Sequence, residues 1–524
     1  MSWNVLTPDQ VFGSERTAKL RESGLWRDQV LPELVDSWAD ESPDDVAVID
    51  DERQLSIGEL RDLAWKVAGG LHEQGVRPGD RVVVQVTNRV EAVVAMCGVV
   101  RLGAILLPAQ TALRKYDIAQ MLARTQPTAI ISIGQHRGFD HREMLAEVVA
   151  DVPSVRGVFI VGSDPGPFRA FDELLSAAPY TGPLPDPDDP MLIIFTSGTT
   201  AQPKGCVHTG NTYLSTGRGT GAALATTRDD VILMPSPVMH TTGLVVGVMV
   251  PLVYRVTTVL QAIWEPHAAM ELIARHRCTL TVGATAFATM FLDAYDPARH
   301  DMSSMRIFGL AGSPIPAKTV QQVQGTFGVD VATLYGSTEA LIATATRVGD
   351  PIERIASSDG IATEGVEIWI VDPFGRELPR GTEGEIRLKS PGRFLCYWAD
   401  DERTREVVDE HGRFKSGDNA RMDEDGYIRL VGRKSEMIIR GGMNISPAEI
   451  ESLLVEHPLI ADVAVVAMPD ERLGEKSCAF VVSSGDHAPT LADVVSFLSD
   501  RGLAKFKLRE TIAARLAEEP LATA

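Results

Sequence analysis

Short apolar segments alternate with amphipathic ones along the first 310 residues of the chain. Apolar residues recur at helical spacing across residues 60–71, and Ser56 with Glu59 forms a capping box before them. Further helices are predicted at 91–102 and 116–123. Short apolar runs of the length of a buried strand occur at 81–86, 104–107, 128–133, 192–195, 230–234, 280–282 and 306–310. Buried strands separated by helices are typical of parallel sheets covered on both faces. We therefore predict an α/β fold.

The pattern changes toward the C-terminus. Shorter strands joined by turns are predicted at 369–372, 384–388 and 427–431, which makes a small β unit. Ser446, Pro447 and Glu449 then open a new helix, and strands at 463–467 and 479–482 with a helix at 491–498 complete an α+β unit. We predict a large N-terminal body (1–432) of parallel-rich α/β subdomains plus the small β unit. A hinge (433–436) and a small, mobile α+β C-terminal lid (437–524) follow.

Composition narrows the class of protein. A chain of 524 residues is too long for a single core, and its net charge of −21 argues against a nucleic-acid partner. The five cysteines are scattered without a C-x-x-C pair, which disfavours disulfides and structural zinc. The first ten residues lack the pattern of a signal peptide, and the longest apolar runs are too short to span a membrane. We expect a soluble, cytoplasmic protein, and the sequence leaves open whether it forms a homodimer.

The most informative motif begins at the end of a predicted strand. Residues 196–205 read TSGTTAQPKG, in which small and hydroxyl-bearing residues precede Lys204. Such a loop can surround a polyphosphate with N–H and O–H donors while the lysine supplies a positive charge. It is not a Walker loop, because Pro203 stands where that pattern needs glycine. A flexible Ser/Thr/Gly surface loop would have the same composition.

Three other segments carry polar groups that suit a nucleotide. Residues 334–340 read LYGSTEA after a predicted strand, so an aromatic ring and a carboxylate lie where ligands bind in open α/β sheets. Asp418 and Arg433 flank a predicted hairpin and suit the hydroxyls of a ribose, although Asp418 is also an ordinary turn residue. His240 follows another strand, and a lone histidine is more often structural than catalytic.

These segments together resemble one family. Six of them, in order and at similar spacing, resemble the core motifs of the adenylate-forming superfamily, which contains acyl-CoA synthetases, aryl-acid ligases, adenylation domains and luciferases. They are residues 196–205, 335–339, 384–385, 416–418, 432–433 and 441–442. The resemblance covers nearly the whole chain. It implies that a carboxylate attacks the α-phosphorus of ATP to give an acyl-adenylate and pyrophosphate, after which the lid rotates and an acceptor, usually coenzyme A, takes the acyl group.

The resemblance also implies roles for individual residues. The β- and γ-phosphates would be held by Lys204, Thr196, Ser197, Gly198, Thr199 and Thr200. Tyr335 would stack on adenine with Gly336 beside it, and Asp418 and Arg433 would hold the ribose. Thr338 would contact the α-phosphate, and Glu339 would bind Mg²⁺. The residues acting in catalysis would be Lys204, His240, Thr338, Glu339 and Arg433.

The same resemblance locates the acid and the acceptor. The acyl pocket would be lined by His240, Gly283, Phe287, Ala311, Gly312 and Ala340, and Gly441 with Gly442 would line the acceptor tunnel. These positions contain no basic side chain that would bind a second carboxylate of the substrate. No aspartate near residue 240 would bind a substrate ammonium group. We therefore favour a compact cyclic or aromatic acid.

Four departures from the family pattern bear on the reaction. Ala201 replaces a glycine of the phosphate loop, Ser435 replaces the aspartate or lysine of the hinge, and Met443 replaces a glutamate of the acceptor loop. The usual terminal Gly-Lys is not found before Ala524, which indicates a truncated sequence, another lysine or a changed first half-reaction. We favour an ATP-dependent acid–CoA ligase. The alternatives are an enzyme with a non-thiol acceptor or altered nucleophile, such as an amide synthetase or a diazotase using nitrite and an aryl amine, and a non-catalytic relative.

Overall fold

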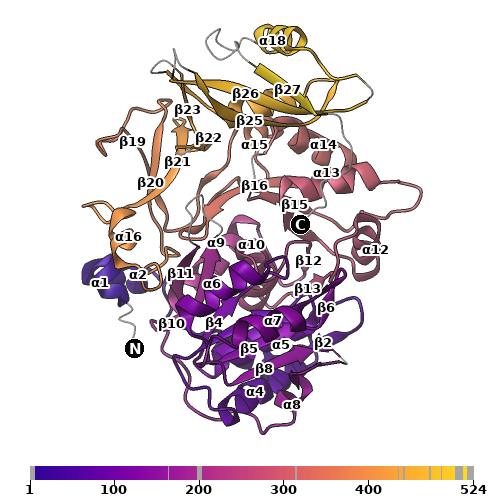
Figure 1. Cartoon of the computed structure of the whole chain (residues 1–524), viewed down its shortest axis with the longest axis vertical. Helices are drawn as coiled ribbons and strands as arrows, with labels where there is room; N and C mark the ends of the chain where they lie inside the picture. Colours follow the sequence, from indigo (N-terminus) through magenta and orange to yellow (C-terminus); the bar gives the residue numbers. More distant parts are fainter. Residues whose placement is uncertain are drawn as a thin grey trace.

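The computed structural model describes residues 6–162, 164–196, 203–312, 315–434, 436–440, 443–470, 474–485, 487–501 and 511–515. Figure 1 shows two α/β layers at the base of the molecule, a small antiparallel sheet (orange) beside them and a separate α+β unit (yellow) at the far end. The predicted α/β body and small C-terminal unit are therefore confirmed. The boundary of the lid at residue 437 stays a prediction.

A seven-stranded sheet holds the motif of residues 196–205. Its order is β11-β10-β4-β3-β5-β8-β9, and every neighbouring pair is parallel except β10 with β11. The strands are β3 (Arg81–Gln85), β4 (Ile105–Pro108), β5 (Ala129–Ile133), β8 (Gly157–Val161), β9 (Arg169–Ala170), β10 (Pro190–Thr196) and β11 (Lys204–Thr209). The sequence pattern did not indicate β11. The motif thus joins two antiparallel strands, and Thr196 lies directly opposite Lys204.

A nine-stranded sheet forms the second layer, in the order β18-β17-β16-β15-β14-β12-β13-β1-β2. The strands from β16 to β1 run parallel, and the pairs at both edges are antiparallel. The strands are β1 (Val46–Ile49), β2 (Gln54–Ser56), β12 (Val231–Met234), β13 (Thr257–Leu260), β14 (Leu280–Gly283), β15 (Ile307–Ala311), β16 (Asp330–Ser337), β17 (Leu341–Ala345) and β18 (Ile361–Ala362).

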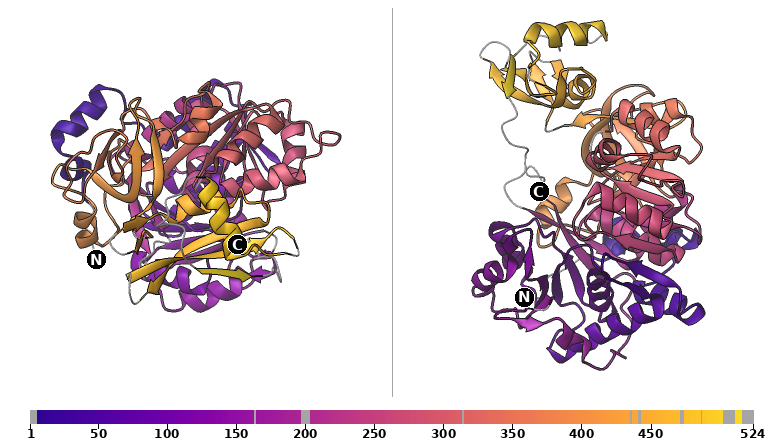
Figure 2. Two further views of the ribbon diagram at one scale, coloured as in Figure 1. Left: turned by 90° about the horizontal axis from the view of Figure 1, so that it is seen from above. Right: turned by 90° about the vertical axis from the view of Figure 1, so that its right-hand side faces the viewer.

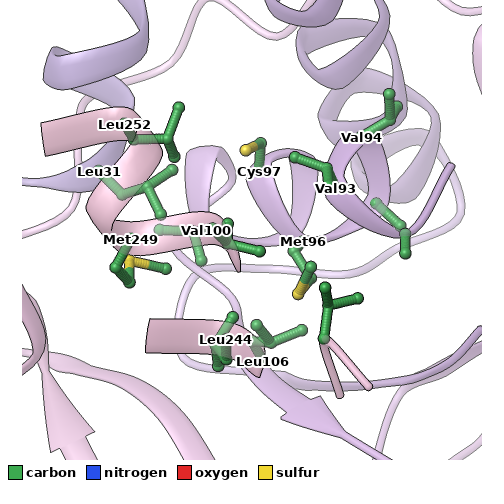
Figure 3. Packing of buried hydrophobic residues seen from close by; sticks show 14 of the residues in the cluster. Leu31, Val93, Val94, Met96, Cys97, Val100, Leu106, Leu244, Met249 and Leu252 are labelled. Atoms are coloured by element: carbon green, nitrogen blue, oxygen red, sulfur yellow. The ribbon is translucent and has the colours of Figure 1, made fainter. Parts of the chain in front are cut away.

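Helices fill the space between the two sheets. The predicted capping box is present, since the Ser56 hydroxyl accepts from the Glu59 amide at the start of α4 (Ile57–Glu73). Helix α5 (Val90–Arg101) is apolar on nearly every side and is buried along almost its whole length. Its side chains pack against α3 (Leu31–Glu41), β4 and the π-helical turn η1 (Val245–Met249), as Figure 3 shows. One core therefore joins both sheets.

The body contains further helices, several of which contribute side chains to the same core. They are α1 (Pro8–Phe12), α2 (Ser14–Glu22), α6 (Lys115–Thr125), α7 (His141–Val149), α8 (Asp172–Leu175), α9 (Gly210–Ala223), α10 (Thr241–Leu244), α11 (Val250–Tyr254), α12 (Pro266–His276), α13 (Thr285–Ala294), α14 (Ala317–Phe327), α15 (Ile352–Ser357) and α16 (Asp401–Glu406). A two-residue pair, β6 (Gln135–His136) with β7 (Phe139–Asp140), precedes α7. Among the described residues, no helix combines the length and apolarity needed to cross a membrane.

The last part of the chain builds the small sheet and the lid. The small sheet is antiparallel and contains β19 (Glu367–Val371), β20 (Gly384–Lys389), β21 (Phe414–Met422) and β22 (Ile428–Arg433). The lid contains β23 (Ile438–Arg440), β24 (Met443–Ile445), α17 (Pro447–Leu454), β25 (Ile460–Asp470), β26 (Gly474–Ser483), α18 (Leu491–Asp500) and β27 (Thr511–Arg515). The right-hand view of Figure 2 shows the lid (yellow) at one end of the molecule, beyond the body.

Candidate active site

The sequence-predicted pocket residues meet at one edge of the nine-stranded sheet. Strands β12, β14, β15 and β16 are consecutive and parallel, so the segments that follow them leave the sheet at the same edge. His240 follows β12, Gly283 ends β14 and Phe287 follows it, Ala311 ends β15 and Gly312 follows it, and Ala340 follows β16. Ligands in open α/β sheets bind at this carboxyl edge. The topology therefore supports a pocket here, while the role of each residue stays a prediction.

The walls of this edge are mostly apolar. Phe287 packs edge to face with Trp264, with ring centroids 4.8 Å apart. A Cβ atom on Gly283 would lie 3.0 Å from the Phe287 ring, so glycine leaves the space beside that ring open. His240 is accessible to solvent and occupies the N-cap position of α10, where its side chain makes no capping hydrogen bond. Desolvation by the neighbouring protein lowers the pKa of its imidazole. Ala340, in contrast, is buried against the small sheet.

Tyr335, Asp418 and Arg433 form one polar group between the body and the small sheet. The Tyr335 hydroxyl donates a 2.7 Å hydrogen bond to Asp418 Oδ2. Asp418 and Arg433 are directly opposite in the β21–β22 ladder, and Arg433 Nε lies 3.4 Å from Asp418 Oδ1. Burial raises the pKa of Asp418, and the Tyr335 hydroxyl and the Arg433 guanidinium oppose that shift. The three predicted nucleoside-binding residues are therefore brought together.

Lys204 and Glu339 converge on a residue that sequence reasoning missed. The Tyr397 hydroxyl donates a 2.7 Å hydrogen bond to Glu339 Oε1. The Lys204 ammonium lies 5.3 Å from the centroid of the same tyrosine ring. One aromatic side chain thus contacts both the predicted phosphate-binding lysine and the predicted metal-binding carboxylate. An isolated tyrosine between Cys396 and Trp398 gives no sequence signal for this role.

Thr338 is held from two sides. Its hydroxyl shares a 3.4 Å hydrogen bond with Thr241, the first residue of α10 after His240. Its carbonyl oxygen accepts a 2.8 Å hydrogen bond from His208 Nε2 on β11. Burial lowers the pKa of His208 to about 4, so the ring is neutral near pH 7. The two hydrogen bonds join Thr338, the predicted α-phosphate contact, to the predicted acyl pocket and to β11. Neither His208 nor Thr241 stood out in the sequence.

Part of the predicted site lies outside the described residues. This holds for Ser197, Gly198, Thr199, Thr200 and Ala201 of the phosphate loop, for Ser435, and for Gly441 and Gly442 of the predicted acceptor tunnel. Their predicted roles stay predictions.

Comparison with known proteins decides the family. The model of the AMP-binding enzyme family matches residues 35–398, and the model of the AMP-binding enzyme C-terminal domain matches residues 449–521. The chain belongs to the AMP-binding enzyme family. It is an ATP-dependent, adenylate-forming ligase, and the predicted membership of the adenylate-forming superfamily is confirmed.

Three relatives illustrate the likeness of this AMP-binding enzyme. A medium-chain fatty-acid–CoA ligase of Escherichia coli is 34% identical over 96% of this chain and 89% of its own. A salicyl-AMP ligase/salicyl-S-ArCP synthetase of Mycobacterium tuberculosis is 32% identical over 94% and 88% of the two chains. The ATP-bound crystal structure of MatB from Rhodopseudomonas palustris is 30% identical, covers 93% of this chain and 95% of its own, and superposes with a TM-score of 0.84.

The backbone of the AMP-binding enzyme requires a glycine next to Tyr335. The β16–β17 ladder shifts register between Tyr335 and Gly336, and Leu341 adopts a positive φ of 55°. A Cβ atom on Gly336 would lie 1.9 Å from the Leu341 carbonyl oxygen, which is far inside van der Waals contact. Gly336 therefore allows the bulge that brings Thr338 and Glu339 to the sheet edge.

The side chains of this AMP-binding enzyme fit a metal ion that binds together with the nucleotide. Among the described residues, no group of three or more His, Cys, Asp or Glu side chains could hold a metal ion. Mg²⁺ commonly binds through one or two carboxylates together with substrate phosphates and water. Glu339, held at one oxygen by Tyr397, supplies one such carboxylate, so the residues present fit this mode of binding.

Proposed function

We propose that this ligase activates a small cyclic or aromatic carboxylic acid as its acyl-adenylate and passes the acyl group to coenzyme A. The observation that carries the proposal is the cluster of Lys204, Tyr397 and Glu339 next to a mostly apolar sheet edge. The cluster suits MgATP, and the edge suits an acid without a second charge. One relative is named as a CoA ligase and another as an aryl-acid ligase, which supports both halves of the proposal.

The proposed first step depends on charge and position. Lys204 offsets the negative charge of the β- and γ-phosphates, and the group of Tyr335, Asp418 and Arg433 fixes the nucleoside. Glu339 would hold Mg²⁺, which would supply Lewis-acid stabilisation of the charge on the phosphates. Thr338, tied to Thr241, fixes the distance from the α-phosphate to the acyl pocket. His240 is neutral near pH 7, so it can donate a hydrogen bond without trapping the carboxylate as an ion pair.

The residues at the pocket edge support a small acid that carries a ring. Gly283 leaves room beside Phe287, whose ring packs edge to face with Trp264 and gives this edge an aromatic surface. Ring–ring contacts favour a planar or cyclic substrate.

The direct test is pyrophosphate release with a panel of acids, with and without coenzyme A. We expect benzoate-like and small alicyclic acids to give turnover that rises when coenzyme A is added. Lys204→Ala and Glu339→Ala should each lower the rate about 10²–10³-fold, because each removes a charge-stabilising group. Lys115→Ala, which breaks only a surface ion pair with Glu147, is the matched control and should retain the wild-type rate.

A second acceptor class is favoured by two sequence departures. Ser435 and Met443 replace charged residues of the family at the hinge and the acceptor loop. The same assay therefore includes arms with primary amines and with nitrite plus an aryl amine. Turnover that requires nitrite, or an amide product without coenzyme A, would replace the CoA proposal. Wild-type rates for Glu339→Ala would instead contradict the assignment of the metal site.

A further inference from the structure

We propose that Tyr397 is a positioning residue that orders the Mg²⁺-binding carboxylate and the phosphate-binding lysine together. The inference rests on the proposed function, because it takes Glu339 as the metal ligand and Lys204 as the phosphate contact. It adds one residue outside the motifs that the sequence indicated, and it explains how two distant segments act as a single nucleotide site.

The backbone around Tyr397 connects these two segments. Residues 395–398 pair with β11 just after Lys204. Leu395 N donates to Val207 O (2.8 Å), Val207 N donates to Cys396 O (3.0 Å) and Trp398 N donates to Gly205 O (2.7 Å). At the other end of this segment, Phe394 N donates to Glu339 O (2.7 Å). The segment therefore fixes the backbones of both Lys204 and Glu339 relative to Tyr397.

The side chain of Tyr397 is held firmly within this frame. It is only 2% exposed, and its ring packs against Phe394 with centroids 4.8 Å apart. Burial and the nearby Glu339 carboxylate raise the pKa of the hydroxyl well above its ordinary value. The Tyr397 hydroxyl donates its hydrogen bond to Glu339 Oε1. A carboxylate fixed at one oxygen presents its other oxygen in a set direction.

The face of the Tyr397 ring contacts the Lys204 ammonium. At 5.3 Å from the ring centroid, the ammonium is within the range of a cation–π interaction. This contact holds the flexible lysine side chain beside β10 and β11 before the phosphates arrive. Hydrogen-bond partners that orient a metal ligand are typically worth about 10–100-fold in metal affinity or activity. Tyr397 therefore has two separable contributions, one from the hydroxyl and one from the ring.

Two variants separate these contributions. Tyr397→Phe keeps the ring and removes the hydroxyl, whereas Tyr397→Leu removes both. We would measure ATP binding by titration calorimetry without any acid, once with Mg²⁺ and once with EDTA. For Tyr397→Phe we expect affinity to fall about tenfold with Mg²⁺ and to stay unchanged in EDTA. Tyr397→Leu should lose affinity in both conditions, because Lys204 also loses its partner.

The matched control is Tyr254→Phe. It removes a hydroxyl that donates to the Arg218 carbonyl at 2.8 Å, away from the site, and should bind ATP like wild type. Unchanged Mg²⁺-dependent affinity in folded Tyr397→Phe would overturn the inference, and so would an equal loss with Mg²⁺ and with EDTA. Failure of the proposed function has a different signature: wild type would bind MgATP yet turn over no acid, and the Tyr397 comparison would still be readable.

Discussion

His208 shows how one residue can connect stability with the site. It is completely buried on β11, donates to the Thr338 carbonyl and packs edge to face with Tyr213 at 5.5 Å. Its pKa falls from the ordinary 6.5 to about 4, because burial disfavours the imidazolium. His141 is a second buried histidine with a pKa of about 4 for the same reason. Both side chains must gain a proton when the chain unfolds in acid.

The two buried histidines make the folded chain less stable as the pH is lowered. Between about pH 6.5 and pH 4 the unfolded chain binds more protons than the folded one, so stability falls as the pH is lowered. At about 1.4 kcal/mol per pKa unit, His208 alone accounts for roughly 3 kcal/mol across this window. His208→Gln keeps an amide donor for Thr338 but does not titrate, so its loss of stability in acid should be smaller than that of wild type.

Denaturant unfolding tests this prediction by comparing the free energy of unfolding at neutral pH with that at about pH 5. The control is His411→Gln, at a histidine whose side chain is 62% exposed, and it should keep the wild-type pH dependence. A His208→Gln variant that loses as much stability in acid as wild type would show that His208 is not a source of the effect.

Asn88 connects elements of the two sheets. It lies between β3 and α5 and is 5% exposed. Its amide nitrogen donates to the carbonyls of Met234 (3.3 Å) and Ser236 (3.0 Å), and its oxygen accepts from the Val238 amide (2.8 Å). These three bonds fix the segment between β12 and α10, at whose end His240 lies. The shape of the pocket edge therefore depends on an element of the other sheet.

Asn88→Ala should lower both stability and substrate affinity. Leaving buried backbone groups unpaired costs about 1–3 kcal/mol, and the freed segment should raise the KM for the acid several-fold more than that for ATP. Gln85→Ala is the matched control, because Gln85 is equally buried at the end of β3 but donates to the Gln110 carbonyl instead. It should lose stability without the change in KM. Equal KM effects in both variants would argue against a positioning role for Asn88.

The same elements show where sequence reasoning succeeds and where it stops. Strands β3, β4, β5, β10, β12, β14 and β15 and the capping box of α4 follow from local patterns, and the strand ends agree within one or two residues, whereas β8 and β13 were not predicted. Strand β11 was missed because its partners are β10 and the distant segment 395–398. The Glu339–Tyr397 contact joins residues 58 apart, and the Tyr335–Asp418 contact joins residues 83 apart. The family resemblance implied that Tyr335 and Asp418 share a nucleoside site but not that they touch, while nothing local signals the contact of Glu339 with Tyr397.

At the scale of the whole molecule, the lid has a hydrophobic core of its own. The core is formed by Ile438, Ile445, Ile450, Leu454, Ile460, Val465, Ala479, Val481, Val494 and Leu498. Polar contacts join the lid and the adjoining residues to the small sheet: the Ser446 hydroxyl donates to Val431 O, Lys434 N donates to Gly417 O (2.8 Å), and Lys434 Nζ lies 3.5 Å from Glu385. A unit with a separate core and a mainly polar junction should unfold as a cooperative unit of its own.

Leu454→Ala in α17 tests this independence. Leu454 is completely buried, so the substitution should cost the lid about 2–5 kcal/mol and move only the smaller of two calorimetric transitions to lower temperature. Leu122→Ala is the matched change in the body, because Leu122 is also completely buried on a helix, α6. It should move only the larger transition. If both variants instead shift a single shared transition, the lid and body unfold together, and the polar junction couples them more strongly than its few contacts suggest.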